Sequence, residues 1–203
     1  MMASLKYIEG DATKPVGSGM KIIPHICNTD GQWGSGFVVA LTKRWAKSKL
    51  AMHYHTWHRI TSYDKNADGI DINCLDMSDD DWENLAPVDF TLGNIQAIKV
   101  EDDIIVANMI AQKSTGGQVF DLTNQKNIVL YPLRFSSLYE CMLHVAVLAE
   151  KHDASIHCPR FGAGLASGVR QGYNKDVWQD IEDAIQGVWV GNGIDVTVYD
   201  YKG

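Results

Sequence analysis

The stretch His25-Ile26-Cys27-Asn28-Thr29-Asp30-Gly31-Gln32-Trp33-Gly34-Ser35-Gly36 organises the rest of the chain. An apolar run of strand-forming residues, 20–26, leads into it, and an apolar-periodic segment that begins at Phe37 leads out. This pattern predicts a strand, a glycine-rich loop and the start of a helix. Glycines let a ligand approach the main chain closely, and the N–H groups at a helix start favour phosphate or an oxyanion. For the loop taken alone, an ordinary turn with satisfied polar residues is the alternative interpretation.

Composition and charge narrow the class of protein. The chain has 203 residues, of which 45% are hydrophobic, and this suits one domain over residues 1–203 with an acidic insertion at about 61–89. The formal net charge of -7 argues against nucleic acid as a partner, because phosphate-backbone binding relies on clustered Lys and Arg. No apolar run is long enough to span a membrane and no secretory signal is visible, so we expect a cytoplasmic protein without a membrane partner. The four cysteines are widely spaced, which favours buried thiols over a disulfide framework.

Two segments invite a metal-binding interpretation. His53, His55 and His58 fall in a helical pattern, but only His55 and His58 share a face. Residues 64–69 match the opening of a calcium loop, whereas the twelfth place, which should supply a bidentate carboxylate, is Leu75. We therefore expect an aromatic stripe and a solvated insertion, with no metal site and no cofactor.

Apolar periodicity predicts an alternation of strands and helices. We expect strands at 5–9, 20–26, 92–100, 104–111, 155–159 and 195–199. Helices are expected from 37 to about 60, as one helix or equally as two with a break near 46–48, from 132 to 152 with Pro132 in the first turn, and from 177 to 188. A long polar loop of the kind that covers a ligand is expected to run from 112 to 131. The alternation predicts an α/β protein with helices on both faces of a mixed sheet. In such sheets ligands bind at the carboxyl ends of the strands, and both glycine loops, 31–36 and 160–165, follow strands.

Five segments of the chain, taken in order, resemble the macrodomain family of ADP-ribose-binding modules. They are Gly10-Asp11, residues 25–36, Val106 to Gln112, Pro159-Arg160-Phe161-Gly162-Ala163-Gly164-Leu165, and Val196 to Asp200. The resemblance implies a three-layer α/β/α fold with a central mixed sheet. Asn28 with the glycines that follow it is most similar to the branch of ADP-ribose 1″-phosphate phosphatases, and the Pro159 to Leu165 run also resembles the branch that removes ADP-ribose from protein glutamate.

The resemblance also implies which residues contact ADP-ribose. Asp11 would accept a hydrogen bond from the adenine amino group, and Tyr199 would pack against adenine, with a core-filling tyrosine as the alternative. Backbone N–H groups of the second glycine loop would face the diphosphate, while the first loop approaches the distal ribose. The implied ligand-binding residues are Asp11, Ala12, Gly34, Ser35, Gly36, Gln112, Phe161, Gly162, Ala163, Gly164, Leu165 and Tyr199.

The catalytic positions depart from the glutamate-hydrolase branch. Gln112 stands where that branch has its nucleophilic lysine, and Ala166 stands where it has its catalytic aspartate. The candidate catalytic residues are therefore His25, Asn28 and Asp30, with His25 or Asp30 activating water and Asn28 fixing the distal ribose or the water. Each has a structural alternative: a core histidine, a loop-stabilising asparagine and a turn aspartate.

These residues lead to three functional hypotheses. The first is hydrolysis of a substituent on the distal ribose of bound ADP-ribose, with ADP-ribose 1″-phosphate yielding ADP-ribose and phosphate. The second, which rests on the missing lysine and aspartate, is a non-catalytic reader of ADP-ribose or of an ADP-ribosylated protein. The third is deacylation of O-acetyl-ADP-ribose or release of ADP-ribose from protein in the same pocket.

Overall fold

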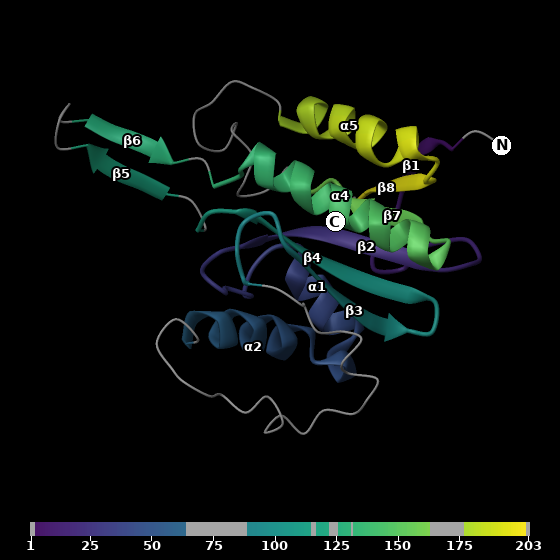
Figure 1. The fold of residues 1–203 in the computed structure, drawn as a ribbon, viewed down its shortest axis with the longest axis horizontal. Helices are drawn as coiled ribbons and strands as arrows, with labels where there is room; N and C mark the ends of the chain where they lie inside the picture. Colours follow the sequence, from purple (N-terminus) through teal and green to yellow (C-terminus); the bar gives the residue numbers. More distant parts are fainter. Residues whose placement is uncertain are drawn as a thin grey trace.

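The computed structural model of the protein describes residues 3–63, 89–114, 117–121, 126–130, 132–162 and 177–201. The calcium-like stretch, Leu75, and the expected site residues Ala163, Gly164 and Leu165 lie outside these ranges. The described residues form a central sheet with helices on both faces (Figure 1).

Six strands make up the central sheet. In spatial order they are β1 (Leu5–Glu9), β8 (Val196–Asp200), β7 (Ser155–Pro159), β2 (Lys21–Asn28), β4 (Ile104–Gln112) and β3 (Ile95–Glu101). Neighbouring strands are parallel except for β3 and β4, which pair antiparallel. The sheet is therefore mixed, as predicted, and the carboxyl ends of β2, β4 and β7 lie at the same end of it.

The sheet separates two layers of helices (Figure 1). One face is covered by α1 (Phe37–Arg44), the short 3-10 helix η1 (Ala46–Ser48) and α2 (Leu50–Tyr63). The other face is covered by α4 (Phe135–His152) and α5 (Val177–Val188), which is followed by η4 (Val190–Asn192). Of the two alternatives for the first helical segment, the structure shows two helices, with the break at η1. The three-layer α/β/α arrangement expected from the sequence is confirmed.

Strand β4 holds both layers to the sheet. All nine of its residues are buried, in keeping with its near-continuous apolar sequence. Ile105 and Met109 belong to the core cluster that includes α4 and α5, whereas Val106 packs in the cluster that includes Leu41 of α1. Because successive strand side chains point to opposite faces, a strand that is apolar throughout contributes to both layers of the core.

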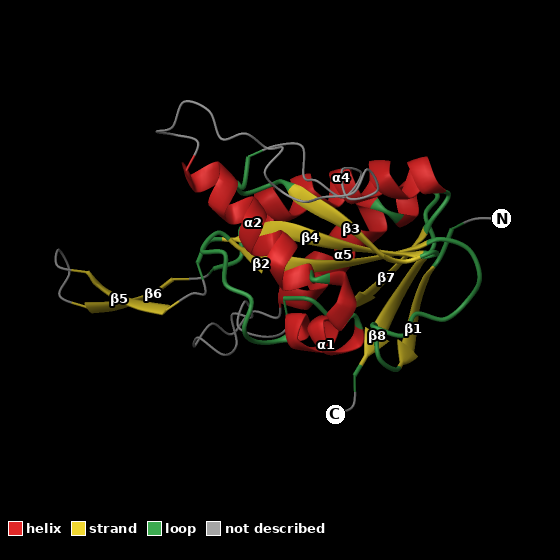
Figure 2. Ribbon diagram, turned by 90° about the horizontal axis from the view of Figure 1, so that it is seen from below, coloured by secondary structure: helices red, strands yellow, loops and turns green. Residues whose placement is uncertain are grey.

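The segment predicted as a long polar loop contains a β-hairpin. Strands β5 (Gly117–Asp121) and β6 (Lys126–Leu130) pair antiparallel and project from the body of the molecule (Figures 1 and 2). The loop prediction was wrong because it weighed only the polarity of the segment. A hairpin outside the core needs few apolar residues, and strand-forming residues such as Val119 and Ile128, which lie opposite each other, are enough to favour it.

Helix α4 begins later than predicted. Its first residue is Phe135, so Pro132 precedes the helix instead of lying in its first turn. Backbone hydrogen bonds from Lys113 N to Pro132 O (2.7 Å) and from Arg134 N to Ala111 O (2.8 Å) pair residues 132–134 with the end of β4. This pairing holds the segment extended, and the helix starts after it.

Candidate functional site

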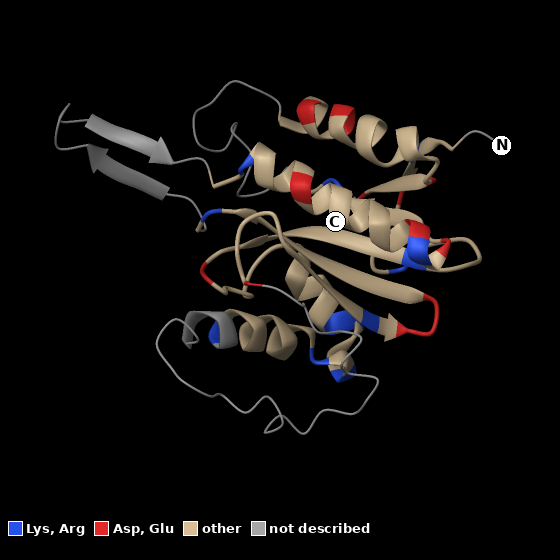
Figure 3. Ribbon diagram, viewed as in Figure 1, with Lys and Arg blue, Asp and Glu red and all other residues tan. Residues whose placement is uncertain are grey.

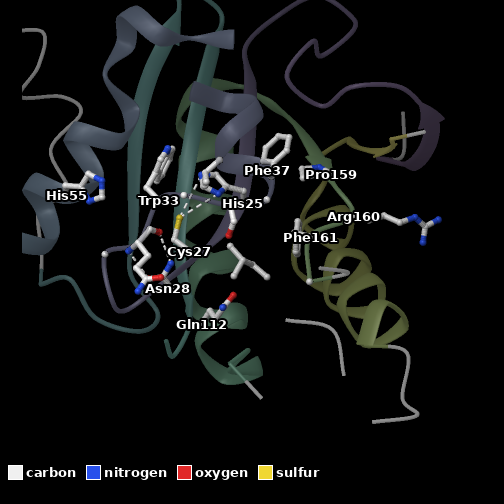
Figure 4. A pocket seen from close by; sticks show the side chains of 18 residues that line it. His25, Cys27, Asn28, Trp33, Phe37, His55, Gln112, Pro159, Arg160 and Phe161 are labelled. Carbon is white, nitrogen blue, oxygen red and sulfur yellow. Dashed lines mark hydrogen bonds between the residues drawn. The ribbon is translucent and has the colours of Figure 1, made fainter. Parts of the chain in front are cut away.

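A cavity of about 850 Å³ opens at the carboxyl ends of β2 and β7 (Figure 4). Residues 25–28 and 31–38 line one side of it, residues 159–162 line another, and Gln112 at the end of β4 lies between them. His55 reaches the cavity from α2. The cavity therefore brings together eight of the predicted site residues, which are His25, Asn28, Gly34, Ser35, Gly36, Gln112, Phe161 and Gly162.

The side chain of Asn28 shapes the first glycine loop. Its Oδ1 accepts hydrogen bonds from the backbone N–H groups of Asp30 and Gln32, both at 3.0 Å, and its Nδ2 donates to Gln32 O at 2.8 Å. The loop is also tied to β4, because Thr29 N donates to Gln112 O at 2.9 Å. Asn28 thus fills the loop-stabilising role that was the alternative to a catalytic one.

Two glycines of this loop adopt backbone angles that favour glycine. Gly36 is the N-cap of α1 with φ 77°, and Gly31 has φ 69°. A Cβ atom on Gly31 would lie 2.6 Å from the ring of His58, so the loop packs directly against α2. The loop consequently leads into the N-terminus of α1 beside the cavity, where helix N–H groups and the helix dipole favour an anion.

His25 lies buried beneath the cavity, with only 2% of its surface exposed. Its Nε2 lies 2.6 Å from Asn108 Oδ1, and Asn108 Nδ2 in turn donates to Gln96 Oε1 at 3.0 Å. The other ring nitrogen, Nδ1, lies 3.7 Å from Cys27 Sγ. Burial lowers the pKa of His25 to about 4, so the ring is neutral at pH 7 and donates from Nε2 to Asn108.

Aromatic side chains enclose this histidine. The rings of Trp33 and Phe37 contact His25 edge-on, with centroids 5.5 and 5.9 Å away. Trp33 is fixed by a hydrogen bond from Nε1 to Thr42 Oγ1 (2.8 Å), and Tyr54 packs 5.2 Å from the Trp33 ring. These contacts exclude water and hold β2 and its loop in place.

Cys27 lines the same cavity but is a poor nucleophile. Burial raises the pKa of its thiol well above the ordinary value, so the thiol stays protonated at neutral pH. Cys141 and Cys158 are likewise buried free thiols, as the sequence predicted, and Cys74 lies outside the described residues.

Asp30 lies on the solvent side of the loop. Asp30 is exposed to solvent, and it does not line the cavity. The two hydrogen bonds that Asn28 accepts turn the chain at this point, which directs residue 30 outward. The structure therefore brings two of the three predicted catalytic residues to the cavity, and Asp30 does not line it.

A second cavity of about 590 Å³ adjoins the first. It is lined by the predicted residues Asp11, Ala12 and Tyr199, and it shares Gly36 and Phe37 with the first cavity. Pro159 is also common to both. Asp11 Oδ1 accepts hydrogen bonds from Thr13 N (2.9 Å) and Thr13 Oγ1 (2.8 Å), which fixes the carboxylate at the cavity wall.

Tyr199 is held by a buried polar network. Its hydroxyl accepts from Val16 N (2.9 Å) and lies 2.8 Å from His157 Nδ1, while His157 Nε2 lies 3.0 Å from Ser155 Oγ. Burial, with a smaller contribution from Lys21, lowers the pKa of His157 to about 4. The neutral ring can thus accept from the tyrosine through Nδ1 and donate to the serine through Nε2, which satisfies every group in the network.

The described part of the second glycine loop packs closely on α5. Gly162 has φ 82°, a backbone angle that strains any other residue, and a Cβ atom there would lie 2.6 Å from Ile181 Cδ1. Phe161 is 5% exposed, with its ring 6.1 Å from Trp178. Arg160 points away from the cavity (Figure 4) and bonds instead to Asp200. Ala163, Gly164 and Leu165 lie outside the described residues, so their predicted contacts stay predictions.

Comparison with known proteins gives the family. No protein-family profile and no curated protein matches the sequence. A protein of unknown function from Bacteroides thetaiotaomicron is 35% identical, with a TM-score of 0.70, and the match covers 98% of both chains. A macrodomain protein from Streptomyces coelicolor is 31% identical, with a TM-score of 0.68, and the match covers 98% of this chain and 100% of that one. The chain belongs to the macrodomain family.

A more distant fold relative of this macrodomain is DarTG from Thermosipho africanus, solved in complex with ADP-ribose. It is 12% identical, with a TM-score of 0.55, and the match covers 98% of this chain and 41% of that chain. At this identity the likeness shows the shared fold.

Several lining residues of the macrodomain were missed by sequence reasoning. Phe37 lines both cavities, His55 lines the first, and Lys14 and Tyr201 line the second. The position of Phe37 directly after the glycine loop was a usable signal. His55 drew notice only as a metal ligand, because nothing in the sequence shows that α2 folds back over the loop.

The described residues of the macrodomain offer neither a metal cluster nor a membrane-spanning helix. Among them, no group of three or more His, Cys, Asp or Glu side chains is placed to hold a metal ion. In the same part of the chain, no helix has both the length and the apolar character needed to cross a membrane.

Proposed function

We propose that this macrodomain binds ADP-ribose across both cavities, with adenosine in the 590 Å³ cavity and the distal ribose in the 850 Å³ cavity. The observation that carries the proposal is that the two cavities share Gly36, Phe37 and Pro159. The N-terminus of α1 therefore lies at their junction, where a ligand with a central diphosphate carries its negative charge. The complex of the fold relative DarTG with ADP-ribose supports the proposal.

The adenosine end would be recognised by Asp11 and Tyr199. Thr13 engages Oδ1 of Asp11 with two hydrogen bonds, which leaves Oδ2 for the adenine amino group. The hydroxyl of Tyr199 is bound to Val16 and His157, so its ring contributes through packing.

The proposed reaction is hydrolysis of ADP-ribose 1″-phosphate. Water attacks phosphorus, the bond between phosphorus and the 1″ oxygen breaks, the 1″ oxygen takes up a proton from solvent, and ADP-ribose and inorganic phosphate leave. N–H groups of the loop at Gly34, Ser35 and Gly36 would stabilise the charge on the transferring group. Gln112 and Asn28 would fix the distal ribose, and Asp30 would accept the proton of the attacking water, for which its carboxylate has to turn toward the cavity.

A specific observation favours a second candidate function, a reader that binds ADP-ribose without hydrolysis. Both ring nitrogens of His25 face protein atoms, and Asp30 does not line the cavity. Gln112 occupies the place of the lysine found in the glutamate-hydrolase branch, so that route offers no nucleophile either. The physiological ligand of a reader would be an ADP-ribosylated protein.

Phosphate release from ADP-ribose 1″-phosphate tests the proposed reaction. We expect release by the wild-type protein at a rate that Asp30→Asn lowers at least about 100-fold, the usual contribution of a general base. His25→Gln, which keeps a hydrogen-bonding group near Asn108, should retain most of the rate. If the protein bound ADP-ribose tightly but released no phosphate, even at high enzyme concentration, the phosphatase proposal would be rejected in favour of the reader. Product analysis with O-acetyl-ADP-ribose and with ADP-ribosylated protein distinguishes the remaining hydrolase activities.

A further inference from the structure

The outward face of α4 carries a row of exposed apolar side chains. Phe135, Tyr139, Leu143 and Val147 are spaced four residues apart, and between 39% and 66% of each is exposed. Residues with this spacing form one ridge along the surface of a helix. The other large apolar side chains exposed in the described part of the chain are dispersed singly over β1, α1, α2 and two loop segments, as is normal for a protein surface.

Few charged residues interrupt this α4 ridge. Glu140 is the one Asp, Glu, Lys or Arg residue of the helix before its last turn, and Figure 3 shows α4 in tan over most of its length. The opposite face of the helix is buried in the core through Leu138, Cys141, Met142 and Val145. The ridge is therefore apolar surface that the fold of a single chain leaves exposed.

The order of residues makes the ridge complementary to itself. Its two aromatic residues, Phe135 and Tyr139, lie in the N-terminal half, and its two aliphatic residues, Leu143 and Val147, lie in the C-terminal half. A twofold axis that crosses α4 near residue 141 sets two copies of the helix antiparallel. Each aromatic ring then faces a smaller aliphatic side chain, with Tyr139 opposite the partner's Leu143 and Phe135 opposite the partner's Val147. This is the isologous contact of a symmetric dimer.

Polar side chains beside the ridge favour the same arrangement. Glu140 and His144 lie four residues apart on one flank of the ridge and are exposed, and neither forms an ion pair in the described part of the chain. The same twofold axis brings Glu140 opposite the partner's His144. The symmetry repeats this pairing, so two carboxylates each accept a hydrogen bond from an imidazole at the rim of the contact.

The area of the ridge suits a dimer at the small end of the stable range. An aromatic side chain presents about 150–250 Å² when fully exposed, so the four half-exposed side chains present on the order of 400 Å² per copy. Because homodimer interfaces are about 65% apolar, this ridge corresponds to roughly 1,200 Å² of total buried surface, the lower limit for a specific interface.

We propose that the α4 ridge is the contact surface of a symmetric dimer of this macrodomain, with a second copy packed antiparallel on it. None of its four residues lines either cavity, so the dimer leaves both cavities of each copy open to ligand. The proposal therefore stands apart from the proposed binding of ADP-ribose.

Sedimentation velocity of the full chain, from micromolar to near-millimolar concentration, tests the proposal. We expect a monomer–dimer equilibrium in the wild-type protein. Leu143→Asp buries a charge at the centre of the contact in both copies, so it should raise the dimer dissociation constant at least about 100-fold. Met52→Asp, which changes an exposed apolar residue of α2, is the matched control and should leave the equilibrium unchanged. Both side chains are exposed, so urea unfolding should show that neither substitution disturbs the core.

An exchange of the two rim residues tests the orientation of the copies. His144→Glu places two carboxylates opposite each other, so it should raise the dissociation constant about tenfold, and Glu140→His in the same chain should restore it. A wild-type protein that stays monomeric at every concentration would overturn the proposal, as would a dimer that Leu143→Asp leaves intact. If the exchange failed to restore the dimer, the antiparallel arrangement would be overturned.

Discussion

His25 and His157 make a natural comparison, because one lies beneath each cavity. Both are buried, and burial lowers the pKa of each to about 4. Their hydrogen bonds lead in different directions. His25 is bonded inward to Asn108 on the neighbouring strand β4, whereas His157 is bonded to Tyr199, whose ring lines the adenosine cavity.

The difference shows that the same residue type has a different consequence in each place. His25 joins two central strands, so its chemistry contributes to the stability of the sheet. His157 fixes Tyr199 at the cavity wall, so a change at His157 should alter the affinity for the ligand. His25, which the sequence offered as a candidate catalyst, is in the structure the more structural of the two.

Removing His25 should give the largest effect. His25→Ala leaves a void and a buried Asn108 oxygen without its donor, which we expect to lower the free energy of unfolding by about 3 to 4 kcal/mol. Urea unfolding followed by tryptophan fluorescence measures this. His157→Ala should lower stability less and weaken ADP-ribose binding more. If the two substitutions changed stability and affinity alike, the distinction between the histidines would be lost.

Acid should destabilise the protein through both histidines. An unfolded imidazole takes up a proton near pH 6.5, whereas folded His25 does so only near pH 4, so the unfolded state binds more protons between these values. Stability is therefore complete above pH 6.5 and falls as the pH drops toward 4, by up to about 3 kcal/mol for His25.

Two non-titrating variants separate these contributions. Unfolding free energies of His25→Gln and His157→Gln, measured from pH 7 to 4.5, should each lose part of the wild-type pH dependence. An unchanged slope in His25→Gln would show that another group accounts for the loss of stability in acid.

Tyr199→Phe should have a smaller, local effect. The substitution keeps the ring but removes the hydroxyl that Val16 and His157 bind, which should cost about 1 kcal/mol of stability and weaken ADP-ribose binding about threefold. Titration calorimetry gives the affinity, and the rate of phosphate release at saturating substrate should stay at the wild-type value. A loss of that rate without a change in affinity would contradict the proposed role of Tyr199 in binding adenine.

Asp30→Asn should change ADP-ribose affinity least, by less than about twofold, because the side chain is exposed and does not line the cavity. Asp11→Asn is the matched control. It replaces a carboxylate that does line a cavity, so it should weaken binding clearly in the same titration. A larger loss from Asp30→Asn than from Asp11→Asn would require a different placement of the ligand.

Much of the fold was predictable because the signals are local. The apolar run of β4, the helical spacing of Leu138, Cys141, Met142 and Val145 in α4, and the glycines that follow β2 and β7 each carry their own evidence. The order of these elements then predicted the α/β fold class and the end of the sheet at which both cavities lie.

What could not be predicted depends on residues far apart in the chain. Whether His25 is satisfied depends on Asn108, 83 residues away, and the start of α4 depends on pairing with the end of β4. Such features are set by tertiary contacts, for which a sequence has no period or motif.

The most direct test of the central claim is calorimetric titration of ADP-ribose into the wild-type protein and into Asp11→Ala. The two adjoining cavities predict one molecule of ADP-ribose bound per chain, with affinity reduced at least about fivefold in Asp11→Ala through loss of the adenine contact. Absence of binding to the wild-type protein, or equal binding by both proteins, would contradict the assignment of the two cavities to the two ends of ADP-ribose.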